Sequence, residues 1–293
     1  MADPPTRPTF SLLDGGPSRD VSEVEAPPPG PPRAGGTLFD RVLAGLERLE
    51  DNDPFVTIVE DAMVSPGGFP LHPHQGFETI SLVLEGQLLH HDNLGAEPVV
   101  LNPGELRWIS AGRGILLSER PHGRGTCKML QLWLNLPAEH KQGAPSVQLL
   151  HAEQVPTVEF GCLSVRVIAG TVASCTGPGG SATPVDLWDV HVEEDGEATL
   201  PLVASRRGFV IALEGEARLG PSARVLRAGG IARLADEERA GLKIQAPMGA
   251  RLLVCAGDPI REPVVAAGPF VLNTREELEE AFIKLRLGQF GKG

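Results

Sequence analysis

Cysteine is scarce in this sequence, and the few cysteines stand far apart: Cys127, Cys162, Cys175 and Cys255. No two of them form a C-x-x-C pair, so their spacing suggests neither a zinc ribbon nor a disulfide framework. We expect buried thiols in a reducing compartment.

Long apolar runs and a secretory leader are also missing. No apolar stretch approaches the roughly 18 residues that would span a bilayer, and the first residues lack the pattern of a signal peptide. We therefore expect a soluble protein that is not secreted and has no membrane partner. The expected compartment is the cytoplasm, with the nucleus also open if the source is eukaryotic.

Basic residues are outnumbered, with 26 Lys and Arg against 38 Asp and Glu, a net charge of −12 and a pI of about 5.2. This balance disfavours broad contact with nucleic acid, which needs a basic face to displace phosphate counterions, although a local basic patch remains open. The hydrophobic content of 41% supports real cores, and 293 residues suggest about two domains.

The first 36 residues hold nine of the 27 prolines, interleaved with glycine and acidic residues. This composition predicts a disordered tail or extended arm over residues 1–36. Directly after it, Thr37 is a possible N-cap, and apolar residues follow at helical spacing, which predicts one short helix: Leu38, Val42, Leu46 and Leu49.

From Pro54 onward, short β-branched and leucine-rich runs alternate with glycine and proline, as in an all-β barrel or sandwich. The first series of predicted strands is Phe55–Glu60, Phe77–Leu84, Gln87–His91, Pro98–Leu101, Leu106–Ile109, Gly114–Glu119 and Leu130–Leu136. Pro137 through Pro145 has the composition of a linker. The second series is Val147–Leu149, Leu163–Ile168, Leu187–Val192, Phe209–Leu213, Ala217–Leu219, Arg224–Leu226, Ile231–Leu234, Leu242–Gln245 and Arg251–Cys255.

The second series of strands repeats a motif of the first: Leu213-Glu214-Gly215 holds the same position in the second half of the chain as Leu84-Glu85-Gly86 holds in the first half. This repetition suggests a duplicated β-barrel rather than one long domain. At the end of the chain, Thr274 and Glu277 form a capping box, and an apolar stripe ending at Gly288 predicts a C-terminal helix: Leu278, Phe282 and Leu285.

Two histidines, His72 and His74, carry the most specific chemical signal. Alternate side chains of an extended strand point to one face, so both imidazoles can reach one point. Glu119 follows Leu117 by two residues and adds a carboxylate on the face that Leu117 occupies. If the two strands face each other across a small barrel, His72, His74 and Glu119 can surround one ion and leave coordination positions open.

An ordered series of motifs carries a family resemblance. It comprises His72-Pro73-His74-Gln75-Gly76-Phe77-Glu78-Thr79, Leu84-Glu85-Gly86, His90-His91-Asp92-Asn93-Leu94-Gly95, Gly104 with Trp108, Ala111-Gly112-Arg113-Gly114-Ile115, Ser118-Glu119, Gln131-Leu132-Trp133-Leu134-Asn135-Leu136-Pro137 and Gly268-Pro269-Phe270-Val271-Leu272-Asn273-Thr274. Together these motifs resemble the pirin family of two-domain cupins, from about Asp53 to the C-terminus.

The resemblance implies a bicupin: two tandem jelly-roll β-barrels with a short C-terminal helix. We assign residues 37–140 to an N-terminal barrel with the candidate metal site and residues 146–293 to a C-terminal barrel without one. Only His151 and His191 remain after position 145, so the second barrel cannot repeat the site. The resemblance further implies one Fe(II) ion, an intracellular location and, in several members, oxygen-dependent cleavage of quercetin. Similar animal proteins act instead as nuclear, iron-dependent transcription co-regulators.

One ligand of the family pattern is missing. Pirins use two histidines, a third histidine and a glutamate two residues later, which fall here on His72, His74, Leu117 and Glu119. Leu117 cannot coordinate a metal. Lys128 also stands where family members usually have a histidine.

Three accounts of the missing ligand remain open. In the first, His72, His74 and Glu119 form a 2-His-1-carboxylate site suited to Fe(II) or another divalent transition metal. In the second, a further side chain completes the shell, and the candidates are His90, His91, His122 and Glu78. In the third, the site no longer binds metal, because a leucine makes it more apolar.

The functional prediction follows from these alternatives. With metal, the protein is a quercetin 2,3-dioxygenase-like enzyme acting on a small aromatic flavonol, with Glu119 as the base and an apolar wall formed by Phe77, Trp108 and Leu117. With weak or no metal binding, it is a non-catalytic pirin-like binding or transcription co-regulatory protein, whose protein partner the sequence does not identify. For His90 and His91 beside Asp92, we expect a hydrogen-bonded turn rather than catalysis.

Overall fold

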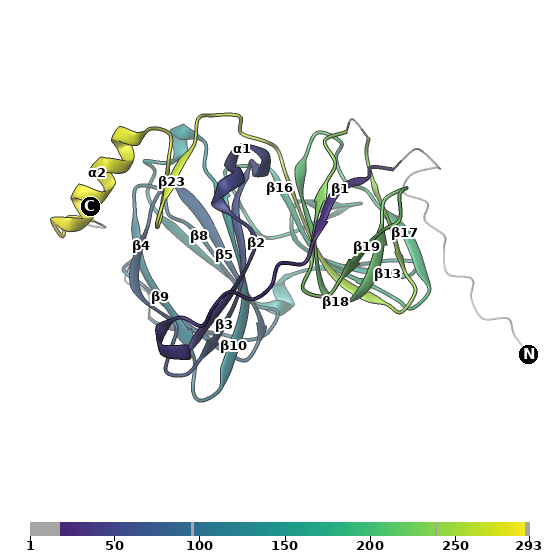
Figure 1. Ribbon diagram of the computed structural model, residues 1–293, viewed down its shortest axis with the longest axis horizontal. Coiled ribbons are helices and arrows are strands. Elements are labelled where there is room, and N and C mark those ends of the chain that lie inside the picture. Colours follow the sequence, from purple (N-terminus) through teal and green to yellow (C-terminus); the bar gives the residue numbers. More distant parts are fainter. Residues whose placement is uncertain (1–17, 95–96, 238, 291–293) are drawn as a thin grey trace, which may run out of the picture. The chain divides into compact units, whose positions relative to one another are not determined.

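The computed structural model describes residues 18–94, 97–237 and 239–290, and it is built almost entirely of strands (Figure 1). It divides into two compact units. The N-terminal barrel comprises Pro27–Gln154, Gly179–Pro184 and the described residues from Pro259 onward. The C-terminal barrel comprises Val155–Pro178, Val185–Asp258 and the described residues up to Ala26. The architecture is the predicted all-β bicupin.

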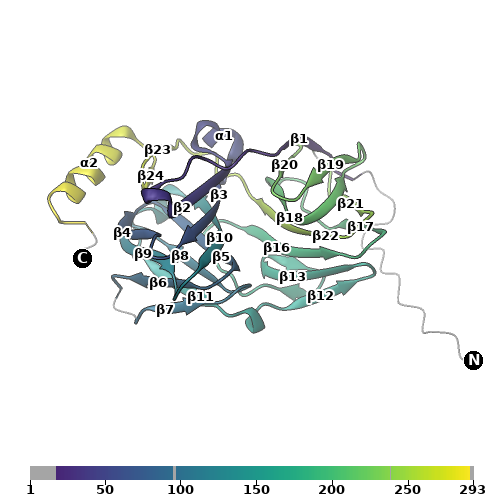
Figure 2. The same cartoon turned by 60° about the horizontal axis from the view of Figure 1, so that its bottom comes forward.

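Two antiparallel sheets form the N-terminal barrel. The six-stranded sheet has the order β11 (Ser146–Leu150), β8 (Leu106–Ser110), β5 (Phe77–Glu85), β10 (Thr126–Asn135), β3 (Phe55–Val64) and β2 (Leu38–Ala44). The four-stranded sheet has the order β4 (Phe69–His74), β9 (Ile115–Pro121), β6 (Leu88–Asp92) and β7 (Val99–Leu101). Figure 2 shows the strands of the smaller sheet following one another in this order.

Apolar side chains from both sheets pack into a common core. Leu88 and Leu101 of the smaller sheet are fully buried against Met63, Val83 and Met129 of the larger one. Burial along β6 and β9 follows the period of two that places alternate side chains on one face. Beside the apolar core, the inner faces carry a cluster of buried polar residues around His74, His90 and Glu119.

The C-terminal segment belongs to the N-terminal barrel. It forms β23 (Val265–Ala267), β24 (Phe270–Leu272) and α2 (Arg275–Arg286). Phe270 bridges to Gln75, the residue after His74, and the Val271 amide donates to the Gln75 carbonyl at 3.0 Å. This segment therefore supports the chain that carries the two histidines.

Helix α2 confirms the predicted C-terminal helix. Thr274 caps it, with its hydroxyl accepting from the Glu277 amide and the Glu277 carboxylate accepting in return from the Thr274 amide. Its apolar stripe packs around Phe270: Leu278, Phe282 and Leu285. Figure 1 shows α2 beside β23.

The C-terminal barrel is a ten-stranded sheet with its own apolar core around Trp188. Its main path is β1 (Val21–Glu25), β20 (Ile231–Leu234), β18 (Arg207–Leu219), β22 (Ala250–Gly257), β16 (Val185–Val192), β13 (Leu163–Ala169) and β12 (Thr157–Phe160). Three strands pair off this path: β17 (Gly196–Leu200), β19 (Arg224–Arg227) and β21 (Leu242–Ala246). A hairpin of β14 (Thr171–Val172) and β15 (Cys175–Thr176) completes the barrel.

The helix predicted after Thr37 is wrong. Leu38–Ala44 is strand β2 at the edge of the larger sheet, because pairing with β3 satisfies its backbone and buries Leu38 and Leu43. Only short helices follow, namely η2 (Leu46–Arg48) and α1 (Leu49–Asn52). The other short helices are η1 (Ala34–Gly36), η3 (Ala138–His140) and η4 (Ala152–Gln154).

The unit boundaries differ from the assigned ones. Of the predicted tail, residues 1–17 lie outside the described residues, whereas Val21–Glu25 pairs with β20 as strand β1. Strand β11 pairs with β8, so the first barrel continues beyond Pro145 to Gln154. The C-terminal helix also joins the first barrel, because the chain returns to it at Pro259. Composition marks loops, but it does not show which sheet a later strand joins.

All four cysteines are free thiols; Cys127 and Cys255 are buried, as expected, whereas Cys162 and Cys175 are only partly buried. Within the part of the chain that the structure describes, no helix is long and apolar enough to cross a membrane.

Candidate metal centre

The predicted ligands lie on neighbouring strands of one sheet, β4 and β9, with β6 next to β9, and not on two strands that face each other across the barrel. In their pairing, His72 lies opposite Leu117, and Leu117 lies opposite Asp92 on its other side. Glu119 lies opposite His90. Directly paired residues share a face, so these side chains all belong to the inner face of the smaller sheet.

His72 and His74 are adjacent, as the i, i+2 spacing predicted, with 4.8 Å between the ring centroids. His74 is buried, whereas His72 is partly exposed. The Nδ1 atom of His72 lies 2.8 Å from the Pro70 carbonyl oxygen. A carbonyl oxygen only accepts, so Nδ1 carries the proton and Nε2 keeps a free lone pair.

Glu119 is a buried carboxylate that bridges the two sheets. Its Oε1 accepts from the Ser81 hydroxyl of β5 at 2.6 Å, and its Oε2 accepts from the Gln131 amide of β10 at 3.0 Å. Burial alone raises the pKa of Glu119, but the nearby His90 and the Ser81 hydrogen bond outweigh it, so the pKa lies below its usual value. Glu119 is therefore ionised, and each oxygen retains a lone pair.

His90, the first of the candidates for a further ligand, joins this group. Its side chain is 1% exposed, and it stands between two carboxylates: Nε2 lies 3.3 Å from Asp92 Oδ2, and Nδ1 lies 3.7 Å from Glu119 Oε1. Arg107 donates to the same Asp92 oxygen at 3.1 Å. Alternation along β6 predicts only that His90 and His91 point to opposite faces, and the structure turns His90 inward.

The predicted turn at Asp92 is confirmed, because its Oδ1 accepts from the Leu94 amide at 3.0 Å. Asp92 thus has two roles: one oxygen shapes the turn after β6, and the other orients the His90 ring.

Leu117 occupies the inner face between His72 and Asp92. It is fully buried and packs with Ile109, Ala111 and Ile115. The departure from the family pattern is therefore located inside the barrel, at the position from which a side chain would reach the two histidines.

The donor set suits a divalent transition metal. Burial, His72 and His90 together hold the pKa of His74 well below its usual value, so His74 is a neutral imidazole, the form that binds metals. The Nδ1 atoms of His74 and His90 are both buried and lack a hydrogen-bond partner among the described residues. As the side chains are placed, no three His, Cys, Asp or Glu residues of the described chain converge closely enough to hold an ion.

Aromatic rings border the histidines. Trp133 stacks on Phe77 with 4.2 Å between the centroids, and His74 packs against both rings. The Trp133 indole donates to Gln131 at 2.9 Å, which in turn holds Glu119. Phe77 of the predicted apolar wall is therefore beside the site, while the Trp108 indole donates to Glu78 at 3.0 Å.

Asp61 is a second buried carboxyl group that the sequence did not single out. Burial raises its pKa to about 7, and the negative charge of Glu119 acts in the same direction. No periodic motif distinguishes Asp61 from the polar residues along β3.

The remaining candidate ligands lie elsewhere. His91 and His122 are exposed. The Glu78 carboxylate accepts hydrogen bonds from the Trp108 indole and the Ala182 amide. Lys128, which stands at a usual histidine position, faces Glu60 and Glu85.

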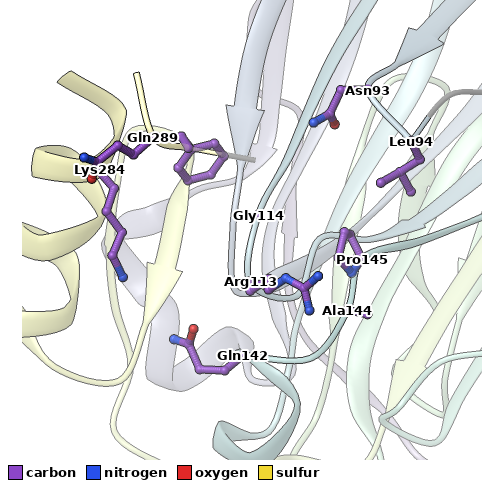
Figure 3. A pocket seen from close by; sticks show the side chains of 10 residues that line it. Asn93, Leu94, Arg113, Gly114, Gln142, Ala144, Pro145, Lys284 and Gln289 are labelled. Atoms are coloured by element: carbon purple, nitrogen blue, oxygen red, sulfur yellow. The ribbon is translucent and has the colours of Figure 1, made fainter. Parts of the chain in front are cut away.

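A separate cavity of about 670 Å³ lies near the C-terminal helix (Figure 3). Arg113 and Lys284 line it together with three side-chain amides, those of Asn93, Gln142 and Gln289. None of the histidines described above contributes to its lining.

Comparison with known proteins identifies the family. A model described as Pirin matches residues 45–134, and one described as Pirin C-terminal cupin domain matches residues 187–291. Mouse pirin is 34% identical over 249 residues, which cover 84% of this chain and 86% of the mouse protein. This chain belongs to the pirin family.

Other relatives carry names that refer to quercetin. A Pseudomonas aeruginosa protein provisionally named quercetin 2,3-dioxygenase is 36% identical over 285 residues, or 92% of this chain and 97% of that protein. The solved quercetin 2,3-dioxygenase of Acinetobacter baumannii has a TM-score of 0.84 at 27% identity, covering 94% of this chain and 99% of that one. A bacterial pirin of Escherichia coli, solved in complex with nickel(II), shares the fold with a TM-score of 0.65 at 18% identity, covering 81% and 98%.

Proposed function

We propose that this pirin is a metal-dependent dioxygenase that opens the ring of a flavonol such as quercetin. The observation that carries the proposal is the inner face of β4 and β9, which carries neutral His74, partly exposed His72 and ionised Glu119 on two paired strands. The names of the relatives supply the substrate class. Fe(II) is the proposed ion, and another divalent transition metal would suit the same donors.

The residues have distinct proposed roles. His72, His74 and Glu119 would hold the ion, which when bound acts as a Lewis acid and lowers the pKa of a substrate hydroxyl group. Glu119 would accept the proton of that hydroxyl, since each of its oxygens retains a lone pair. Ser81 and Gln131 keep the carboxylate in place. Phe77 and Trp133 offer aromatic surface for a flat substrate.

Leu117 favours a second candidate function. A buried leucine in place of a ligand weakens metal binding and would suit a non-catalytic pirin that acts by binding a protein partner, as a transcription co-regulator does. In that case the polar residues around Glu119 would stabilise the barrel and take no part in chemistry.

Oxygen consumption separates the two candidates. The Fe(II)-loaded protein should consume oxygen when quercetin is added, and Glu119→Gln should consume at least ~100-fold less, the scale of a lost acid–base group. Protein that is folded and binds Fe(II), yet consumes no oxygen with any flavonol tested, would favour the binding function.

A further inference from the structure

We propose that His90 supplies the third imidazole of the metal site, in place of the histidine that Leu117 has replaced. The site would then consist of His72, His74, His90 and Glu119. This inference rests on the proposed metal dependence, and it moves the third histidine from the middle strand β9 to its neighbour β6.

The register of the strands makes the exchange possible. His90 and Glu119 are directly paired across β6 and β9, on the same inner face as Leu117. On β4, His72 and His74 lie side by side with 4.8 Å between their ring centroids, and on β6 the Nδ1 atom of His90 lies 3.7 Å from Glu119 Oε1. The three imidazoles and the carboxylate therefore share one face of three neighbouring strands, and side-chain movement would bring them onto one ion.

The orientation of the His90 ring is that of a metal ligand. Metal-bound histidines usually donate their second ring N–H to a carboxylate, which fixes the ring. Here Nε2 faces Asp92 Oδ2 at 3.3 Å, and Arg107 holds that oxygen from the other side. Nδ1 faces Glu119 instead and is buried without a hydrogen-bond partner among the described residues, so it is the ring nitrogen that an ion could reach.

The distance between His90 and Glu119 supports the same assignment. A separation of 3.7 Å between Nδ1 and Oε1 is too long for a hydrogen bond. Two atoms that each bind one ion at about 2.1 Å lie about 3.0 to 3.4 Å apart in octahedral or tetrahedral geometry. The observed gap exceeds this range slightly, so a small movement of either side chain would close it.

The competing explanation is a hydrogen-bonded network without metal, in which a protonated His90 bridges Asp92 and Glu119. Against the effect of burial, Asp92 and Glu119 do raise the pKa of His90, but the geometry fits a bridging ring less well, because Nδ1 lies 3.7 Å from Glu119 Oε1, outside hydrogen-bond range. The His72 ring is also held in place, because its Nδ1 atom donates to the Pro70 carbonyl oxygen. A metal ion bound by both rings better explains why each has one nitrogen held by an oxygen and the other nitrogen left available.

Binding of Co²⁺ tests the proposal. We would titrate the full-length protein with Co²⁺ alone, follow the visible absorption of the bound ion, and obtain affinities by competition with a chelator. His90→Ala should weaken binding at least tenfold and change the spectrum, since even residues behind the ligands typically contribute tenfold or more. His91→Ala is the matched control, because the adjacent ring points outward and is exposed; it should bind as the wild type does.

A rescue variant covers the case in which His90→Ala is poorly folded. Adding Leu117→His to His90→Ala restores a third imidazole at the family position, and it should recover most of the lost affinity. Circular dichroism would verify that each variant retains the fold.

The outcomes separate this inference from the proposed function. An unchanged affinity and spectrum in folded His90→Ala would overturn the role of His90, even if the wild type oxidises quercetin. Failure of the wild type to bind Co²⁺ would also overturn it. Conversely, Co²⁺ binding that depends on His90, without oxygen consumption by the Fe(II) form, would support this inference while contradicting the dioxygenase function.

Discussion

Leu117 lies directly opposite His72 in the pairing of β4 with β9, and its side chain is completely buried. An imidazole at this position would start from the middle strand of the site, on the same face as Glu119. The inner face therefore still has the geometry for the family ligand, although the residue itself has changed.

Leu117→His should tighten Fe(II) binding about tenfold or more, because one added ligand contributes at least ~1.4 kcal/mol. The metal-free variant should lose about 1–3 kcal/mol of unfolding free energy, since the new ring replaces a leucine packed against Ile109 and Ile115. Competitive chelation and urea unfolding measure the two effects. Equal iron affinities in wild type and variant would mean either that residue 117 does not face the histidine pair or that His90 already completes the site, and the same comparison in the His90→Ala background separates the two.

Metal binding should depend on the N-terminal barrel alone. Replacing both His72 and His74 with alanine should abolish uptake, because it removes two of the proposed donors. His191→Ala is the control from the C-terminal barrel, where His191 is exposed on β16. His151→Ala is a control within the N-terminal barrel, where His151 pairs with Glu105 at 2.7 Å. Metal analysis of the purified variants decides the matter, and metal retained by the double variant would show that the site lies elsewhere.

The adjacency of His72 and His74 was predictable from the sequence, because period-two alternation on a strand is a local property. The sequence could not predict the partners of Glu119. Ser81 and Gln131 lie on strands far from Glu119 in the chain, and only the packing of the two sheets brings them to its oxygens. His90 was weighed as a possible ligand, but its burial follows from which face of β6 turns inward, which the sequence of a short strand does not determine.

The fold, too, was predictable where it depends on local sequence and unpredictable where it depends on packing between distant segments. Strand positions from Phe55 to Cys255 were largely predicted from apolar runs and turn residues. Leu38–Ala44 was read as a helix, because its apolar spacing suits either structure and pairing with β3 decided the outcome. The return of Pro259 and α2 to the first barrel was not visible, since sequence order does not fix which unit a segment joins.

Lys141 should give the protein a pH-dependent stability. Its ammonium is buried and donates to Gly76 O, Asn135 Oδ1 and Val271 O at 2.6–3.0 Å. Burial lowers its pKa from 10.5 to about 7. Between these values the unfolded chain binds one proton more than the folded chain, so folding becomes more favourable as the pH rises.

The comparison with Lys141→Met isolates this effect. From pH 7 to pH 9, the unfolding free energy of the wild type should rise relative to that of the variant, by at most ~1.4 kcal/mol per pH unit. Urea unfolding of both proteins at each pH provides the measurement. Parallel curves would show that Lys141 keeps its proton in the folded state throughout.

Gly76 should tolerate no side chain. Its φ is +82°, a conformation that favours glycine, and a Cβ atom would lie 2.0 Å from the Val271 carbonyl oxygen. Gly76→Ala should therefore push β24 away from the histidine strand and lower the unfolding free energy by more than about 1 kcal/mol. Thermal unfolding checks the prediction. Gly123→Ala is the control for the backbone alone, because its φ is also positive and its Cβ would meet nothing within 4 Å; an equal loss in both variants would exclude the contact with Val271.

The metal content of the wild-type protein, purified from cells grown without added iron, tests the central claim most directly. A metal centre in the N-terminal barrel predicts about one transition-metal ion per chain, because neutral histidines and an ionised carboxylate retain such ions at neutral pH. Folded protein that carries no transition metal, and takes none up when Fe(II) is supplied without oxygen, would contradict it.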